Sequence, residues 1–357
     1  MQLPTPPDRT FASDNFAGAH PVVLDAIAEA NHGHATAYGD DPWTAECAAA
    51  FRDLFGTGEM FLVFNGTGAN ILGLISALGP VDAVVCAAGS HINVDEAGAT
   101  ELILGAKLVD LPAPDGKLRA DQLADVDWMF GNEHHVQPAV LSITQSSELG
   151  TVYSSEEVAA LCDAAHRRGM RVHMDGARIA NATAVLGSTQ AALRSFTVDA
   201  GVDVLTFGGT KNGILGGEAV IFLAPDLAAR ARYLRKVITQ LPSKMRFIAV
   251  QFLALLRDDL WLRNAEHSNA MASRLYRGVS GLHGLAIDPP SVNSLFPTLP
   301  AHLVAPLREW SFFWDWDVAK HQVRWMTSWD TTVEDVVRFV DGVTFATHSD
   351  RPGELTN

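Results

Sequence analysis

Short apolar runs alternate with helical patterns from residue 60 to residue 223. The first run leads into a glycine turn, Gly66-Thr-Gly68, and a helical pattern follows it. The expected strands are 60–65, 81–87, 139–144, 171–174 and 204–208. Alternation of this kind predicts an α/β protein with a mainly parallel sheet, which has helices on both faces and ligands at the carboxyl ends of its strands.

The pattern changes after this alternating region. An added strand at 219–223 is followed by long helices at 224–239 and 246–280, and we expect a break in the second helix near Leu262-Arg-Asn264. Strand-like and aromatic segments and a last helix at 332–347 then predict a small α/β domain. We therefore expect a large domain over residues 1–250, which includes an N-terminal arm, and a smaller one over 251–357.

Composition limits the partners of the chain. The 357 residues carry a formal charge of -15, and 48% of them are hydrophobic, enough to build a large core. The negative charge disfavours nucleic acid and anionic membranes as partners. The first nine residues fit neither a signal peptide nor a membrane span, and three cysteines without metal-like spacing favour free thiols in a reducing cytoplasm.

Two charged residues are placed at strand ends. Asp175 closes the run that begins at Arg171, and Lys211 follows the run over 204–208 between glycines. A pyridoxal phosphate enzyme needs a lysine amine to form its Schiff base and a carboxylate to pair with its pyridinium nitrogen. A lysine that faces a carboxylate provides both groups. Two alternatives stay open, because Asp175 could instead cap the helix that starts near Arg178, and Lys211 could be an exposed loop lysine.

The glycine turn after the first strand is a candidate phosphate cradle. Backbone N–H groups at a helix start, the helix dipole and the Thr67 hydroxyl all favour an anion there. A purely structural turn explains the same residues when they are taken alone. The adjacent carboxylates in Tyr38-Gly-Asp-Asp41 are expected to form a turn, and we predict no metal site.

Several segments in a fixed order resemble the threonine aldolases, within the β-eliminating lyase group of fold-type I pyridoxal phosphate enzymes. The resemblance covers nearly the whole chain, and the residues at 143–148 and 150–153 look most like a bacterial branch of low-specificity L-threonine aldolases and phenylserine aldolases. The segments that carry the wider resemblance are Phe11-Ala-Ser-Asp-Asn15, Tyr38-Gly-Asp-Asp41, Asn65-Gly-Thr-Gly-Ala-Asn70, Ser90-His91, Asp175-Gly-Ala-Arg178, Gly208-Gly-Thr-Lys211 and Val323-Arg-Trp-Met-Thr-Ser328.

The resemblance implies a role for each matching residue. Lys211 would form the Schiff base, Asp175 would pair with the pyridinium, and His91 would stack on the ring. The other residues implied to contact the cofactor are Gly66, Thr67, Gly68, Arg178 and Thr210. The residues implied to contact the substrate are Ser13, Tyr38, Gln145, Arg178 and Arg324, and for Arg324 a guanidinium would grip a carboxylate through two hydrogen bonds.

The implied reaction is retro-aldol cleavage of β-hydroxy-α-amino acids such as L-threonine, L-allo-threonine and phenylserine to glycine and an aldehyde. Many threonine aldolases have a histidine near the substrate hydroxyl where this chain has Gln145, and glutamine is not a base. His91, or a water that it orders, is then the candidate base. The resemblance also implies a homodimer or homotetramer. A β-eliminating lyase of the same fold and a non-catalytic ligand-binding relative remain alternatives.

Overall fold

The computed structural model describes residues 3–349, and the chain divides into two compact units. The larger unit is residues 19–262, and the smaller unit joins residues 1–18 to residues 263–357. These bounds differ from the two expected domains in that the N-terminal arm belongs to the smaller unit. As functional domains, the expected 1–250 and 251–357 stay a prediction.

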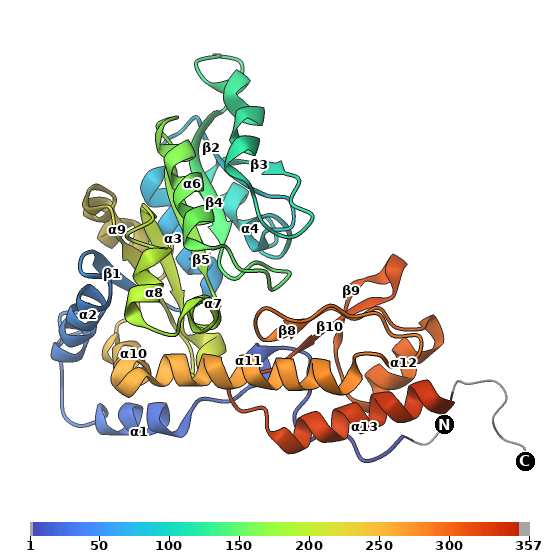
Figure 1. Cartoon of the computed structure of the whole chain (residues 1–357). Coiled ribbons are helices and arrows are strands. Elements are labelled where there is room, and N and C mark those ends of the chain that lie inside the picture. The colour runs from blue at the N-terminus through green and yellow to red at the C-terminus, as the bar shows by residue number, and fades with distance from the viewer. Residues whose placement is uncertain (1–2, 350–357) are drawn as a thin grey trace, which may run out of the picture. The chain divides into compact units, whose positions relative to one another are not determined.

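The larger unit contains a seven-stranded sheet with the strand order β1-β7-β6-β5-β4-β2-β3 (Figure 1). Its strands are β1 (Glu59–Val63), β2 (Asp82–Ala87), β3 (Lys107–Leu111), β4 (Gln137–Thr144), β5 (Arg171–Gly176), β6 (Val204–Gly208) and β7 (Glu218–Phe222). Five neighbouring strands from β6 to β3 are parallel, and β7 is antiparallel to both β1 and β6. The predicted mainly parallel sheet is confirmed.

Ten α-helices accompany this sheet within the described part of the larger unit. They are α1 (Pro21–Glu29), α2 (Pro42–Phe55), α3 (Gly66–Ala77), α4 (His91–Val94), α5 (Ala99–Leu104), α6 (Ser155–His166), α7 (Ile179–Leu186), α8 (Gln190–Ser195), α9 (Pro225–Val237) and α10 (Arg246–Leu256). Helices α3 and α9 share one hydrophobic cluster with β1, β6 and β7. Every residue of β6 and β7 is buried, as in sheets covered on both faces.

Local sequence signals explain where several of these elements begin. Ser154 and Glu157 form a capping box at the start of α6. Asp41 accepts a hydrogen bond from the backbone N–H of Thr44 and caps α2, so the Tyr38–Asp41 segment is the expected turn between helices. The three cysteines, Cys47, Cys86 and Cys162, are all buried and unpaired.

Among residues 3–349, the smaller unit has a three-stranded sheet, in the order β8-β10-β9, and three α-helices. Its elements are α11 (Leu260–Val279), β8 (Ser294–Leu295), α12 (Ala301–Trp310), β9 (Trp314–Asp317), β10 (Gln322–Met326) and α13 (Val333–Ser349). Phe11 of the N-terminal segment lies in its hydrophobic core with Trp325 and Phe339. This burial explains why the N-terminal arm joins the C-terminal part of the chain.

The expected break in the long helix is displaced. We expected it near residues 262–264, but α10 ends at Leu256, and Asp258 has a φ of 52° in the short 3-10 helix Arg257–Asp259. A left-handed residue cannot continue an α-helix, so the chain changes direction there. No helix within residues 3–349 is long and apolar enough to cross a membrane.

Candidate active site

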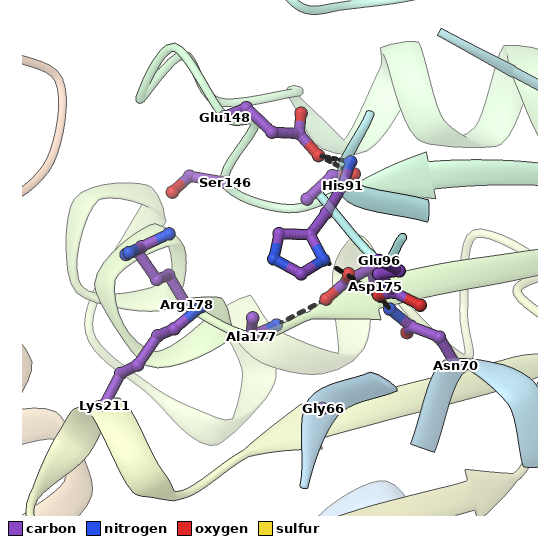
Figure 2. Close-up of a pocket in the computed structure, with 11 residues that line it drawn as sticks. Gly66, Asn70, His91, Glu96, Ser146, Glu148, Asp175, Ala177, Arg178 and Lys211 are labelled. Carbon is purple, nitrogen blue, oxygen red and sulfur yellow. Dashed lines mark hydrogen bonds and ion pairs between the residues drawn. The ribbon is translucent and has the colours of Figure 1, made fainter. Parts of the chain in front are cut away.

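A cavity with about 400 Å³ of empty volume lies at the carboxyl ends of the strands in the larger unit. Thr144 ends β4, Asp175 lies near the end of β5, and Lys211 follows β6. The residues that line it are Gly66, Asn70, His91, Glu96, Thr144, Ser146, Glu148, Asp175, Ala177, Arg178 and Lys211 (Figure 2). The cavity therefore collects Lys211, Asp175 and His91, which are far apart in the sequence.

Asp175 is buried and held by two donors. Asn70 Nδ2 donates to Asp175 Oδ2 at 2.9 Å, and the backbone N–H of Ala177 donates to Oδ1 at 2.9 Å. Burial alone raises the pKa of this carboxyl, but the Asn70 hydrogen bond and the charge of Lys211 outweigh it and hold the pKa below its usual value. Asp175 does not cap α7, whose N-cap is Arg178. Asp175 is thus a buried anion that can pair with a cationic group.

Lys211 lies in a short 3-10 helix, Thr210–Asn212, directly after β6. It lines the cavity and is half-buried, so the exposed loop lysine is not what the structure contains. Behind it, Glu218 Oε2 accepts a hydrogen bond of 2.7 Å from the backbone N–H of Gly209. Burial raises the pKa of Glu218 to about 7. Thr210 hydrogen-bonds to Gly217 and is not among the lining residues.

His91 stands at the N-terminus of α4, and its ring reaches into the cavity (Figure 2). Its Nδ1 lies 2.8 Å from Glu96 Oε1, and its backbone N–H donates to Glu148 Oε1 at 2.8 Å. The hydrogen bond to Glu96 raises the pKa of His91 above its usual value, although burial and Lys211 act in the opposite direction. His91 is therefore a titratable group with a fixed environment.

The glycine turn begins α3. Asn65 caps this helix by accepting the N–H of Gly68 at 2.8 Å, which leaves the N–H groups of Gly66 and Thr67 unused by that cap. A Cβ built on Gly66 would meet no atom within 4 Å, so open space lies beside it. At Gly68 a Cβ would meet the side chain of Gln240 at 2.4 Å. The turn has room for an anion on the Gly66 side.

The structure does not bring Gln145 to the cavity. Its side chain donates to the carbonyl of Tyr153 at 2.9 Å and accepts from the N–H of Tyr153 at 3.0 Å, and the residue is fully buried. Both polar atoms of the amide are thus used by the chain itself, and the substrate contact of Gln145 stays a prediction. The next residue, Ser146, lines the cavity instead, with a buried hydroxyl that has no hydrogen-bond partner within residues 3–349.

Of the other predicted substrate residues, Ser13, Tyr38 and Arg324 are not among those that line this cavity. Ser13 and Arg324 belong to the smaller unit, where Arg324 Nη2 donates to the carbonyl of Ala12 at 3.4 Å. Tyr38 is half-exposed and lines a different depression, with Arg232 and Arg235. Arg178 is the predicted substrate residue that does line the cavity. The roles of these four residues stay predictions.

Five polar lining residues were not predicted: Asn70, Glu96, Thr144, Ser146 and Glu148. Asn70 lies one helical turn beyond the glycine turn, and this spacing was a usable signal. Glu96 and Glu148 are carboxylates in loops with no local pattern that separates them from exposed acids. Their burial depends on the tertiary fold, which a single sequence does not reveal.

The lining residues fit a flat heterocyclic aldehyde that carries a phosphate. The cavity offers one amine, one buried carboxylate with a lowered pKa, one imidazole and the open Gly66 turn. The buried Ser146 hydroxyl without a partner is a further polar atom available to a ligand. This donor set matches the needs of pyridoxal phosphate.

Comparison with known proteins supports this fit. The chain is 41% identical to the low-specificity L-threonine aldolase of Pseudomonas aeruginosa, over 91% of this chain and 94% of that protein. A solved structure of Leishmania major threonine aldolase matches with a TM-score of 0.88 at 30% identity, covering 94% of this chain and 99% of that one. An aspartate aminotransferase from Rhodobacter sphaeroides, 16% identical with a TM-score of 0.68 and covering 98% and 95% of the two chains, shares the fold.

These relatives share the fold-type I architecture of pyridoxal phosphate enzymes, and the expected fold class is confirmed. The model of the β-eliminating lyase family matches residues 10–301. We conclude that the chain belongs to the β-eliminating lyase family, whose cofactor is pyridoxal 5′-phosphate.

Proposed function

We propose that this enzyme is a carbon–carbon lyase of the threonine aldolase type, which cleaves β-hydroxy-α-amino acids to glycine and an aldehyde. L-Threonine, L-allo-threonine and phenylserine are the proposed substrates. The observation that carries the proposal is the cavity in which an amine, a buried carboxylate and an imidazole meet. The identity of 41% to low-specificity L-threonine aldolases supports the substrate class.

When bound, pyridoxal phosphate supplies a protonated ring that draws electrons from the carbon next to the amino group. In our proposal the Lys211 amine, which lines the cavity, would hold the cofactor through its aldehyde. Asp175 keeps the ring nitrogen protonated, because its carboxylate stays ionised and its two donors fix its position. The turn of Gly66, Thr67 and Gly68 would hold the phosphate, and the N–H groups of Gly66 and Thr67 are the ones that the Asn65 cap does not use.

A proton must leave the β-hydroxyl before the bond between Cα and Cβ breaks. We propose that His91 takes this proton, since its imidazole lines the cavity and Gln145 is turned toward Tyr153. Arg178, and Ser13 and Arg324 of the smaller unit, are proposed to hold the substrate carboxylate or the cofactor's phenolic oxygen, and Tyr38 to shape the substrate pocket. Orientation of the carboxylate selects which bond is cleaved.

An assay with purified holoenzyme tests the function. Incubation with L-threonine, L-allo-threonine and phenylserine should release acetaldehyde or benzaldehyde together with glycine in equal amounts. Because the chain matches the β-eliminating lyase family, a β-eliminating lyase is the second candidate. Its products would be ammonia and a keto acid. Bound cofactor without turnover of any of these amino acids would favour a non-catalytic relative.

We further propose that the enzyme is a cytoplasmic homodimer or homotetramer with a small amino acid as its binding partner. The three free buried cysteines support a reducing compartment. The net charge of -15 supports the absence of nucleic acid and anionic membrane partners. Sedimentation equilibrium of the holoenzyme distinguishes a dimer from a tetramer.

A further inference from the structure

A buried carboxylate outside the predicted set contacts both halves of the candidate site. Glu96 follows α4, and its side chain is fully buried. Its Oε1 lies 2.8 Å from His91 Nδ1 and 2.9 Å from Asn70 Nδ2, and Asn70 Nδ2 also contacts Asp175 Oδ2 (Figure 2). Glu96 thus connects to the imidazole directly and to Asp175 through one amide.

The donor and acceptor roles in this cluster follow from the amide. An amide nitrogen only donates, and Asn70 Nδ2 uses its two hydrogens on Glu96 Oε1 and Asp175 Oδ2. The Asn70 oxygen accepts from Thr206 Oγ1 at 3.2 Å, so the amide is oriented from both ends. A flipped amide would turn its oxygen toward two carboxylates. Glu96 Oε1 is therefore an acceptor.

Glu96 also determines which ring nitrogen of His91 carries the proton. The second oxygen of Glu96, Oε2, is buried with no hydrogen-bond partner in the described part of the chain. A buried carboxylate with no hydrogen-bond donor to one oxygen is stabilised only by the donors to its other oxygen. This favours the form of His91 that carries a proton on Nδ1 and donates it to Glu96 Oε1. The remaining ring nitrogen, Nε2, lies on the side of the ring away from Glu96.

We propose that Glu96 is a positioning residue that holds His91 with its proton on Nδ1 and so presents Nε2 to the substrate hydroxyl. The part that Glu96 plays in catalysis rests on the proposed function. The hydroxyl proton passes to Nε2, the electron pair of the O–H bond forms the carbonyl of the departing aldehyde, and the Cα–Cβ electrons remain with the glycine carbon. The arrangement is that of an imidazole base oriented by a carboxylate.

Other charges face His91 and enter any measurement of its pH dependence. Glu96 lies on its own segment, Glu148 holds its backbone N–H from the loop after β4, Asp175 faces it from β5, and Lys211 faces it from beyond β6. Asp175 raises the pKa of His91 and Lys211 lowers it, whereas the hydrogen bond that His91 donates to Glu96 is the largest influence and raises it. Removing the Glu96 charge should therefore lower the pKa of His91.

The decisive measurement is nitrogen NMR of ¹⁵N-histidine-labelled protein, with and without cofactor, in which His91 is assigned by its loss in His91→Asn. Wild-type His91 should carry its neutral-state proton on Nδ1. In Glu96→Gln its titration should move to lower pH by about one unit. Asp95→Asn, which removes the exposed neighbouring carboxylate, should leave the titration unchanged.

Kinetics provide the second readout. In Glu96→Gln, kcat for aldehyde release should fall roughly 10- to 100-fold, its acid limb should shift to lower pH, and KM should stay within about twofold. A wild-type proton on Nε2 would overturn the inference, and this result needs no variant to fold. Unchanged titration and kcat in a folded Glu96→Gln enzyme would overturn it too. Absence of aldehyde release by the wild type would instead refute the proposed function, and the NMR result would still stand.

Discussion

At the scale of single residues, the site depends on buried ionisable groups whose surroundings set their charge. Asp175 is held ionised by Asn70, Ala177 and Lys211, whereas burial raises the pKa of Glu218 and Glu148. Opposite shifts in neighbouring carboxyl groups separate Asp175, which stays anionic, from Glu218, whose pKa of about 7 lets it carry a proton near neutral pH.

Replacing Lys211 by alanine should abolish turnover. The amine that holds the cofactor's aldehyde is lost, so aldehyde release should fall by at least about 1,000-fold, and the visible absorbance of the bound cofactor should change. Lys107→Ala, at an exposed position in β3, is the matched control and should keep full activity. Measured aldehyde release and absorption spectra of the two variants check this, and an active, spectrally unchanged Lys211→Ala would refute the role.

Glu218 should make stability depend on pH. Its folded pKa is about 7, above the ordinary 4.5, so the folded state binds more protons between these values and stability falls as pH rises from about 4.5 to 7. The upper limit of this loss is about 3 kcal/mol. In cofactor-free protein, the urea midpoint should drop from pH 5 to pH 8 more steeply for the wild type than for Glu218→Gln.

The exposed Glu59 provides the control for this experiment. Glu59→Gln should follow the wild-type pH dependence, because it leaves the buried Glu218 carboxyl and its surroundings in place. Parallel curves for wild type and Glu218→Gln would show that Glu218 is ionised throughout this range.

At the scale of elements, the site exists because the ends of β5 and β6 approach each other closely. A Cβ on Gly208 would lie 2.3 Å from the carbonyl oxygen of Ala177, and one on Gly176 would lie 2.3 Å from the carbonyl oxygen of Thr206. Only residues without a Cβ allow the two strand ends that carry Asp175 and Lys211 to lie side by side.

Gly208→Ala should therefore disturb both strand ends. The backbone must move, which should destabilise the protein by about 2–3 kcal/mol and weaken cofactor binding. Gly216→Ala in the following loop is the control, since a Cβ there would meet nothing within 4 Å. Denaturation midpoints and cofactor titrations measure both effects. Equal denaturation midpoints and equal cofactor affinities of Gly208→Ala and Gly216→Ala would contradict the importance of the close approach at Gly208.

The elements also show how far the sequence could be interpreted. Apolar runs predicted β1, β2, β4, β5, β6 and β7, and strand ends identified Lys211 and Asp175 as partners, because these signals are local. The orientation of Gln145 toward Tyr153 and the burial of Glu96 arise from contacts with other segments. No local pattern encodes them, so the sequence did not predict the contact of Gln145 with Tyr153, and Glu96 was missed.

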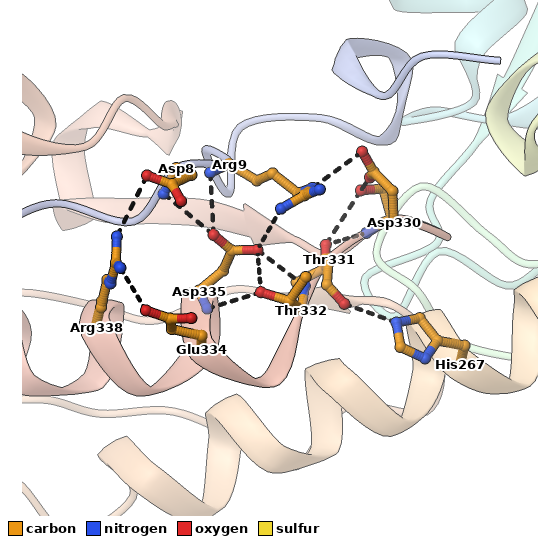
Figure 3. Close-up of polar contacts among 10 residues, drawn as sticks. Asp8, Arg9, His267, Asp330, Thr331, Thr332, Glu334, Asp335 and Arg338 are labelled. Atoms are coloured by element: carbon orange, nitrogen blue, oxygen red, sulfur yellow. Dashed lines mark hydrogen bonds and ion pairs between the residues drawn. The ribbon is translucent and has the colours of Figure 1, made fainter. Parts of the chain in front are cut away.

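At the scale of the whole molecule, the two ends of the chain build one unit. Asp335 in the first turn of α13 accepts hydrogen bonds from the N–H groups of Asp8 and Arg9, from the Arg9 guanidinium and from Thr332 (Figure 3). Arg338 links Asp8 to Glu334 in the same way. Together these contacts attach the N-terminal segment to α13.

Asp335→Asn should loosen this attachment. The buried carboxylate serves several donors, so its loss should cost the smaller unit about 3 kcal/mol and speed proteolysis near residue 9. Burial raises the pKa of Asp335, but the hydrogen bonds from Thr332 and Arg9 and the Arg9 charge hold it below the usual value. The stability it adds is therefore present above about pH 4 and lost as pH falls further.

The control is Glu334→Gln, which changes an exposed carboxylate one residue away. Limited proteolysis of both variants, followed by mass spectrometry of the fragments, gives the comparison. If Glu334→Gln opened the N-terminal segment as readily as Asp335→Asn, the carboxylate of Asp335 would have no special part in holding it.

The cysteine thiols of the protein all lie in one unit. Cys47 in α2, Cys86 in β2 and Cys162 in α6 are all buried in the larger unit, and the chain has three cysteines in total. Burial raises the pKa of each thiol, so an aromatic disulfide reagent reacts only after the surrounding structure opens. The rate at which the absorbance of the released product rises therefore measures unfolding of the larger unit. It does not respond to unfolding that is confined to the smaller unit.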